Sequence, residues 1–213
     1  NSSTPVLHYS TTPFLVSIFR LFIQLIVCVL VISPLAQAST EENEAKVLYN
    51  KYQDRVYQIQ VIEVASGEKS STGSGFQITP EGHVATNYHV VSKVIHDPDL
   101  YRLEYIQTTG ETGKLIVLDV DVIHDLAVVI GNDLPEVYIP LGSAALEKGT
   151  RIYSLGNPRD LGMAIVEGTY NGLLEKSLYE EIFFSGSINP GMSGGPAIDS
   201  EGNVIGVNVS IMR

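Results

Sequence analysis

A single serine stands among glycines and prolines in the segment Asn189-Pro190-Gly191-Met192-Ser193-Gly194-Gly195-Pro196. Glycine adopts backbone angles and close approaches that other residues do not tolerate. A nucleophilic serine needs such a turn, because its Oγ must project into a cleft while neighbouring backbone N–H groups converge on one point. The segment therefore predicts Ser193 as a nucleophile, with the N–H groups of Gly191 and Ser193 holding an oxyanion. Taken alone, it also fits a glycine-rich hairpin without chemistry.

His89 is the best candidate for the base that a nucleophilic serine requires. It lies at the end of a predicted strand, in the run Ala85-Thr86-Asn87-Tyr88-His89-Val90-Val91. The other four histidines lie in the N-terminal segment, in a turn or beside polar neighbours. A lone histidine is more often solvated than catalytic, so this assignment depends on its partners.

Asp125 can supply the carboxylate that orients the base. It stands directly before the apolar run Leu126-Ala127-Val128-Val129, where a carboxylate is partly buried. A surface aspartate that begins a strand is the alternative reading of this position. His89, Asp125 and Ser193 follow one another in the chain order of the chymotrypsin arrangement.

The elements that must position these residues are short strands. From residue 56 onward, β-branched and aromatic runs alternate with Gly, Pro, Asn and Asp, which indicates an all-β sandwich or barrels. Residues 132–149 connect two halves, a first barrel of about 56–131 and a second of about 150–213. The first half holds six predicted strands: Val56–Ala65, Gly73–Thr79, His83–Thr86, Tyr101–Gln107, Gly113–Asp119 and Leu126–Ile130. The second half holds five: Thr150–Gly156, Met163–Leu173, Tyr179–Ser185, Gly195–Asp199 and Asn203–Ser210.

Two helical pieces accompany the strands. Glu41 to Arg55 has helical spacing, with Ala45, Leu48 and Tyr52 on one face, and predicts a helix packed on the surface. A short helical turn is expected after His89.

The N-terminal segment reads as a targeting element. Arg20 precedes an apolar run that Pro34 ends, and Ala36-Gln37-Ala38 follows with small residues at the positions of a cleavage site. We expect residues 1–38 to be a signal peptide that leaves a protease domain at 39–213, secreted or periplasmic. An uncleaved helix over residues 14–36 that anchors the chain in a membrane is the alternative.

Charge and cysteine content exclude several classes of function. Of 213 residues, 24 are acidic and 13 basic, and all but Arg20 of these lie after residue 38. Such an acidic body lacks the basic face that nucleic-acid binding needs. The single cysteine, Cys28, lies in the apolar run, so the body has no disulfide, thiolate metal site or cysteine nucleophile.

Six segments, in one consistent order, carry a resemblance to a known family. They resemble the trypsin-like (chymotrypsin-fold) serine proteases, and most of all the HtrA/Deg-type bacterial envelope proteases. The resemblance implies two six-stranded β-barrels with the active site between them, and the same triad. Only five strands are found in the second half and no PDZ-like sequence is present, so we expect a truncated second barrel and no PDZ domain. The segments are Gly73–Phe76, Thr86–Val91, Asp125–Val128, Gly156–Pro158, Asn189–Pro196 and Val204–Asn208.

The resemblance also implies how substrate binds. The strand Gly206-Val207-Asn208 would pair with the substrate backbone. Ser187, six residues before the nucleophile, would form the floor of the specificity pocket, and Ile188 would line it. Without an aspartate at the floor, an aliphatic or small apolar side chain is expected before the cut. Met192 stands where HtrA-type enzymes commonly have Asn, and we expect its side chain to face substrate.

The leading hypothesis is a serine endopeptidase that cleaves unfolded envelope proteins through an acyl-enzyme, without cofactor or metal. A non-catalytic peptide-binding module on a protease scaffold is the alternative, since fold alone does not establish function. A metal-dependent enzyme is disfavoured, because no His-x-x-x-His pair occurs. The expected partners are polypeptide substrates, and the resemblance adds a homotrimer.

Overall fold

The computed structural model describes residues 44–142, 146–175, 177 and 179–209. The expected signal peptide or anchor, with Cys28, lies outside the described residues. Within those that are described, no helix combines the length and apolar character that crossing a bilayer requires.

The described part of the chain begins with a helix over residues 44–52, and the 3-10 turn η1 (Gln53–Arg55) follows. Leu48 and Tyr52 are buried in a core cluster, and Ala45 packs against it. These are the three residues that the sequence placed on one helical face, so that prediction is confirmed.

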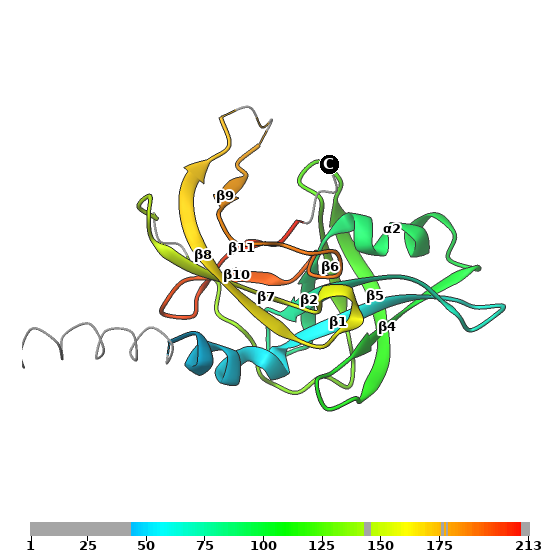
Figure 1. Ribbon diagram of the computed structural model, residues 1–213. Coiled ribbons are helices and arrows are strands. Elements are labelled where there is room, and N and C mark those ends of the chain that lie inside the picture. The colour runs from blue at the N-terminus through cyan, green and yellow to red at the C-terminus, as the bar shows by residue number, and fades with distance from the viewer. Residues whose placement is uncertain (1–43, 143–145, 176, 178, 210–213) are drawn as a thin grey trace, which may run out of the picture. The chain divides into compact units, whose positions relative to one another are not determined.

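The first half forms a closed six-stranded barrel. Its strand order is β1-β2-β3-β6-β5-β4, and it closes because β1 pairs with both β2 and β4 (Figure 1). The apolar residues that alternate along these strands fill the interior, with Tyr57, Ile59 and Val129 fully buried. The strands are β1 (Val56–Glu63), β2 (Lys69–Gln77), β3 (His83–Thr86), β4 (Tyr101–Ile106), β5 (Thr112–Asp121) and β6 (Leu126–Ile130).

The second half forms a five-stranded sheet in the order β11-β10-β7-β8-β9. Five strands were expected here, and five are found among the described residues. They are β7 (Arg151–Gly156), β8 (Ala164–Leu173), β9 (Ile182–Phe184), β10 (Pro196–Ile198) and β11 (Val204–Val207), with the 3-10 turn η2 (Pro158–Asp160) between β7 and β8.

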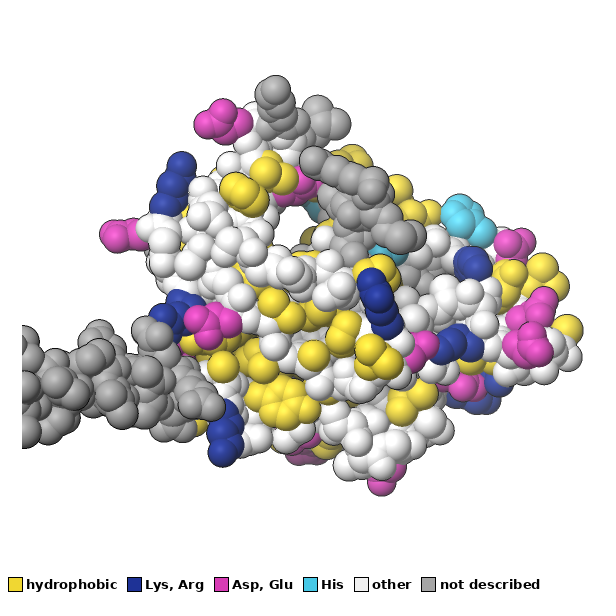
Figure 2. All heavy atoms as spheres, viewed as in Figure 1, with side chains coloured by type: hydrophobic (Ala, Val, Ile, Leu, Met, Phe, Trp, Pro, Cys, Tyr) yellow, Lys and Arg dark blue, Asp and Glu magenta, His cyan; other side chains and the backbone are white. Residues whose placement is uncertain are grey.

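A second core cluster joins the two halves. Val56 and Phe76 from the barrel and Tyr153 and Leu155 from the sheet are all buried in it. The barrel and the sheet therefore share apolar contacts, and this shared core fixes the strand ends that carry the candidate site. On the face in Figure 2, apolar side chains are exposed among both acidic and basic ones.

Several expected elements differ in their bounds from the structure, and β2 begins at Lys69, four residues before its predicted start at Gly73. The helical turn after His89 is instead a nine-residue helix, α2 (Tyr88–His96), whose Val90, Val91 and Val94 pack on the barrel core. Strand β9 is shorter than predicted, and its pairing with β8 shifts register between Tyr170 and Leu173. The last predicted strand ends at Val207, and position 210 lies outside the described residues.

Candidate active site

His89 and Asp125 form a close, two-point contact. The ring Nδ1 of His89 lies 2.6 Å from Asp125 Oδ2, and the backbone N–H of His89 donates to Asp125 Oδ1 at 2.9 Å. The His89 side chain is 46% exposed and that of Asp125 is 22% exposed. With Nδ1 held by the carboxylate, the other ring nitrogen, Nε2, is left to exchange a proton with a substrate or nucleophile.

The local backbone explains why Asp125 reaches His89. Asp125 has φ +55°, a left-handed conformation that aspartate adopts more readily than most residues. Its carbonyl accepts hydrogen bonds from the Asn87 side chain at 2.9 Å and from the Tyr88 N–H at 3.1 Å. Its carboxylate therefore lies at the N-terminus of α2, where helix N–H groups and the helix dipole favour a negative charge.

Ser193 lies in a tight turn that requires two of its glycines. Gly191 and Gly194 have φ of +96° and +88°. The turn closes on itself, since Met192 N–H donates to Asn189 at 3.0 Å and Gly195 N–H to Met192 at 3.1 Å. Ser193 is 5% exposed.

The turn packs directly on the barrel strands that lead to His89. The backbone N–H of Ser74, on β2, donates to the Ser193 carbonyl at 2.7 Å. A Cβ added at Gly194 would come within 2.3 Å of Thr86 Oγ1 and 2.1 Å of the Ser74 carbonyl. Thr86 is three residues before His89, so the candidate nucleophile and base belong to segments in contact.

The peptide bond between Pro190 and Gly191 is held in place through its carbonyl. The Pro190 carbonyl accepts a hydrogen bond from the Arg159 N–H at 2.8 Å. Because the peptide is trans, its N–H, which belongs to Gly191, points the opposite way. A Cβ at Gly191 would lie 2.4 Å from the Asn157 carbonyl, so only glycine fits here.

Comparisons with known proteins agree with this geometry. The trypsin-like peptidase domain matches residues 73–207. "Protease Do-like 1, chloroplastic" of Arabidopsis thaliana is 33% identical over 186 residues, which are 80% of this chain and 40% of that protein. A "Probable periplasmic serine endoprotease DegP-like" of Chlamydia pneumoniae is 29% identical over 70% of this chain and 31% of its own. The crystal structure of Deg5 superposes with a TM-score of 0.70 at 32% identity, over 80% of this chain and 86% of that one.

The chain belongs to the trypsin-like peptidase family. Its homology to the HtrA/Deg proteases and its two β-barrel-like sheets confirm the resemblance and the fold that the sequence predicted. It spans about half or less of the length of the curated relatives named above.

Ser74 is a site residue of this trypsin-like domain that sequence reasoning did not assign a role. It is fully buried, and its hydroxyl donates to the Gly191 carbonyl at 2.7 Å. The same hydroxyl accepts from the Asn157 N–H at 3.0 Å. One side chain thus ties the candidate oxyanion turn to β2 and to the end of β7. The signal in the sequence was a small polar residue between two glycines of a strand.

Asn208 and Met192 differ from their expected roles in substrate binding. The backbone of Asn208 is already used, since its N–H donates to Gly195 at 2.8 Å and its carbonyl accepts from Gly194 at 2.9 Å. Its side chain donates to the Leu155 carbonyl at 3.0 Å. Asn208 therefore braces the turn rather than offering an edge to substrate. Met192 is fully buried and its Cβ packs on Gly156, so its side chain does not face a substrate cleft.

The remaining expected binding residues lie in two separate segments. Ser187 is exposed and Ile188 is half-buried in the segment before the turn. Gly206 and Val207 are half-buried on β11, the edge strand of the five-stranded sheet.

The loop before β9 brings an aromatic ring close to Asp125. The Tyr179 ring meets the neighbouring His124 edge-on, with centroids 5.3 Å apart. Desolvation, followed by the negative charges of Glu181 and Asp125, raises the pKa of Tyr179 above its usual value. His124 is held in turn by Asp121, and this hydrogen bond lowers the pKa of the Asp121 carboxyl.

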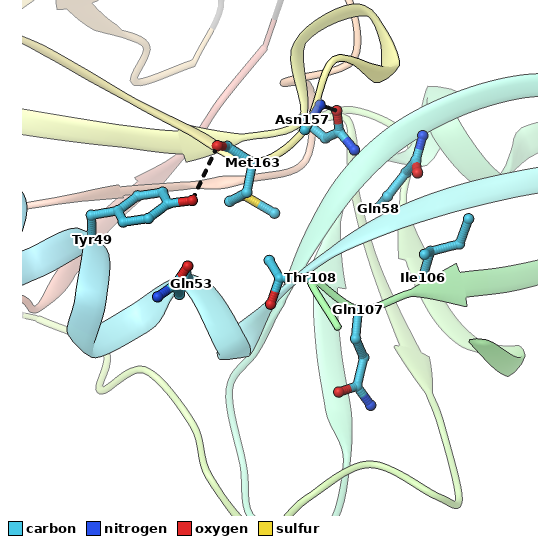
Figure 3. A pocket seen from close by; sticks show the side chains of 9 residues that line it. Tyr49, Gln53, Gln58, Ile106, Gln107, Thr108, Asn157 and Met163 are labelled. Atoms are coloured by element: carbon cyan, nitrogen blue, oxygen red, sulfur yellow. Dashed lines mark hydrogen bonds between the residues drawn. The ribbon is translucent and has the colours of Figure 1, made fainter. Parts of the chain in front are cut away.

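A separate pocket of about 370 Å³ lies between the N-terminal helix, β1, the end of β4 and the loop after β7 (Figure 3). Across it, the Tyr49 hydroxyl donates to the Met163 carbonyl at 3.3 Å. Neither His89 nor Ser193 lines it, so it is distinct from the candidate site. Among the described residues, no cluster of His, Cys, Asp and Glu has the arrangement of a metal site.

Proposed function

We propose that the chain is a serine endopeptidase that uses Ser193 as nucleophile, His89 as general base and acid, and Asp125 to orient the imidazole. The observation that carries this proposal is the two-point contact of Asp125 with His89, 2.6 Å at Nδ1 and 2.9 Å at the backbone N–H. It fixes the ring with Nε2 available, which is the arrangement that an acyl-transfer triad requires.

The proposed reaction has two stages. Ser193 Oγ attacks the peptide carbonyl as its proton passes to His89 Nε2, and the oxyanion is held by the N–H groups of Gly191 and Ser193. His89 then donates that proton to the leaving amine, which leaves an acyl-enzyme. Water attacks the acyl-enzyme by the same route and releases the second product. Asp125 stabilises the imidazolium throughout, and no cofactor takes part.

The proposed substrate is an extended polypeptide with an aliphatic or small apolar residue before the cut. Ser187 and Ile188 support this preference, because neither supplies the negative charge that would select Lys or Arg. Gly206 and Val207, on an edge strand, are the proposed partners of the substrate backbone. A compartment outside the cytoplasm is proposed for the chain, because relatives carry periplasmic and chloroplastic names.

Digestion of a carboxymethylated, permanently unfolded protein tests the proposal, with cut sites read by mass spectrometry. We expect cuts after Val, Ile, Leu or Ala by the wild-type chain, and none by Ser193→Ala. Cuts after Lys or Arg would contradict the pocket assignment. A folded wild-type chain that binds the substrate without cutting it would favour the peptide-binding module instead.

The variant Ser187→Asp is a sharper check of the pocket, because it adds a carboxylate at the proposed floor. We expect its preference to shift toward Lys and Arg before the cut. Glu104→Gln, a charge change of the same size and opposite sign on β4, should leave the preference unaltered.

A further inference from the structure

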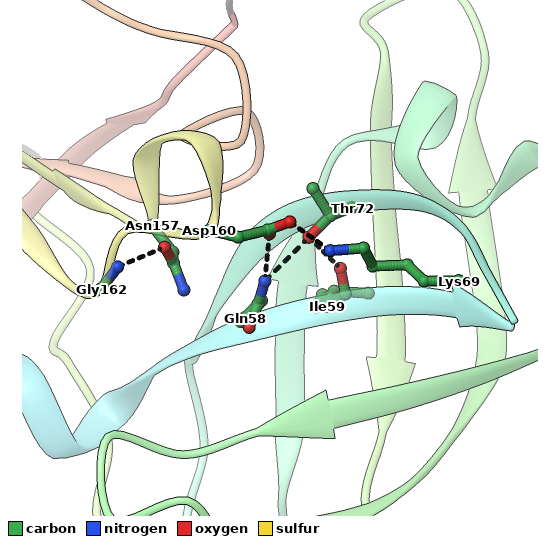
Figure 4. Close-up of polar contacts among 7 residues, drawn as sticks. All are labelled: Gln58, Ile59, Lys69, Thr72, Asn157, Asp160 and Gly162. Carbon is green, nitrogen blue, oxygen red and sulfur yellow. Dashed lines mark hydrogen bonds and ion pairs between the residues drawn. The ribbon is translucent and has the colours of Figure 1, made fainter.

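A polar cluster joins the loop after β7 to the barrel (Figure 4). The Asp160 carboxylate accepts from the Gln58 side chain through Oδ1 and pairs with Lys69 through Oδ2. Gln58 is buried, and its Nε2 also donates to Thr72 at 3.2 Å. Asp160 comes from the second half of the chain and its partners from β1 and β2, so the contact crosses between the halves.

The loop that carries Asp160 has an unfavourable backbone. Arg159 and Asp160 are successive non-glycine residues with φ of +52° and +59°. L-amino acids disfavour this left-handed region, and such conformations persist only where surrounding contacts enforce them. The contacts of Asp160 with Gln58 and Lys69 supply that constraint on one side of the two left-handed residues. At the other end, the Asn157 side chain accepts from the Gly162 N–H at 3.0 Å.

The same loop determines where the Gly191 N–H points. The Arg159 N–H donates to the Pro190 carbonyl, and the Arg159 nitrogen would lie 3.0 Å from a Cβ on Gly191. If Arg159 left its left-handed conformation, the loop backbone on both sides of it would have to reorient, and the Pro190–Gly191 peptide would lose this restraint. Asp160 neighbours Arg159 in sequence, so its contacts with Lys69 and Gln58 act directly on this bond.

We propose that Asp160 is a positioning residue: its contacts with Lys69 and Gln58 hold Arg159 left-handed and so keep the Gly191 N–H aimed at the oxyanion. This inference rests on the proposed serine endopeptidase function. According to this inference, the Asp160–Lys69 ion pair controls the reactivity of Ser193, although both residues lie far from the triad in sequence.

The first test measures the rate at which a fluorophosphonate acylates Ser193 in Asp160→Ala, Lys69→Met and the double variant. We expect losses of about fivefold to tenfold for Asp160→Ala and about threefold for Lys69→Met, with KM for a peptide substrate within about twofold. The double variant should equal Asp160→Ala, because both changes break one interaction. Lys69→Arg should retain the wild-type rate.

Salt separates this role from a general effect on folding. At about 1 M salt the screening length falls to roughly 3 Å, which weakens the Asp160–Lys69 ion pair. The wild-type rate should therefore fall toward that of Lys69→Met, and the rates of Lys69→Met and Asp160→Ala should change little. The matched control is Glu104→Ala, which breaks the half-buried ion pair with Arg102 at 2.8 Å on β4 and should keep the wild-type rate. An Asp160→Ala rate equal to that of wild type would overturn the inference.

Amide hydrogen exchange tests the inference independently of activity. The Arg159 N–H should lose at least about tenfold of its protection in Asp160→Ala, while the Val204 N–H, bonded to Pro140 at 2.8 Å, should not change. Unchanged protection at Arg159 would overturn the inference. A wild-type chain that never reacts with the fluorophosphonate would instead contradict the proposed function, and the exchange result would still decide whether Asp160 holds the loop.

Discussion

Removing the Ser74 hydroxyl should damage catalysis as well as folding, because this group holds the turn that bears the oxyanion donors. Ser74→Ala leaves the Gly191 carbonyl and the Asn157 N–H, bonded at 2.7 and 3.0 Å, without their partner in a buried site. Each unsatisfied buried group costs about 1–3 kcal/mol, so we expect a loss of roughly 2–6 kcal/mol in stability if neither group finds a new partner.

The effect on catalysis follows from the turn. Loss of one oxyanion donor costs about 10²–10³ in kcat, and a turn that is only loosened should lose less, about 10–100-fold. KM should stay within about twofold, since the interaction acts on the transition state. Peptide hydrolysis at saturating and limiting substrate concentrations gives kcat and KM. Urea unfolding of the same variant gives the loss in stability.

Ser154→Ala is the matched control for this experiment. Ser154 is 1% exposed on the adjoining strand β7, and among the described residues its hydroxyl has no hydrogen-bond partner. The same chemical change should therefore leave kcat unaltered and stability equal or slightly higher. If Ser74→Ala retained wild-type kcat while losing stability, or if Ser154→Ala lost kcat equally, the reasoning would be refuted.

Three further results are expected. Asp125→Asn should fold, because asparagine also adopts left-handed backbone angles. Its kcat should fall about 10⁴-fold, because the amide would hold the His89 imidazole in the wrong tautomer. Retained activity in peptide hydrolysis would contradict the role of Asp125 in orienting His89. Met192→Ala should cost about 2–5 kcal/mol in urea unfolding but keep the cleavage preference, whereas a changed preference would restore Met192 as a substrate contact. Burial raises the pKa of Tyr153 to about 12, so this hydroxyl ionises at lower pH in the unfolded chain and stability should fall between pH 10 and 12. Tyr153→Phe should make that fall in stability smaller. An identical pH profile of stability in the variant would refute the contribution of Tyr153.

The barrels were predictable because each strand is a local pattern. Alternating apolar residues between turn residues placed β3 (His83–Thr86) and β6 (Leu126–Ile130) without error. The paired Asp125 and His89 were also found, since a carboxylate before an apolar strand and a histidine after one are visible in a single chain. The length of α2 was underestimated, because its apolar face of Val90, Val91 and Val94 matters only when the barrel is there to cover it.

The supports of the site were not predictable, because they join residues far apart in sequence. Ser74 and Gly191 are 117 positions apart, and nothing local marks their hydrogen bond. The resemblance to the HtrA/Deg proteases implied that Asn208 pairs with substrate, but hydrogen bonds to Gly194 and Gly195 already use its backbone. Met192 was assigned to substrate from its place beside the nucleophile, and the packing against Gly156 buries it instead.

Labelling of the full chain by a fluorophosphonate, with the modified residue located by mass spectrometry, tests the central claim most directly. We expect one adduct, on Ser193, in the wild-type chain, and none in folded Ser193→Ala. His89→Ala should react far more slowly, because its serine lacks a base. A folded wild-type chain that stays unlabelled, or a His89→Ala variant that labels at the wild-type rate, would contradict the account.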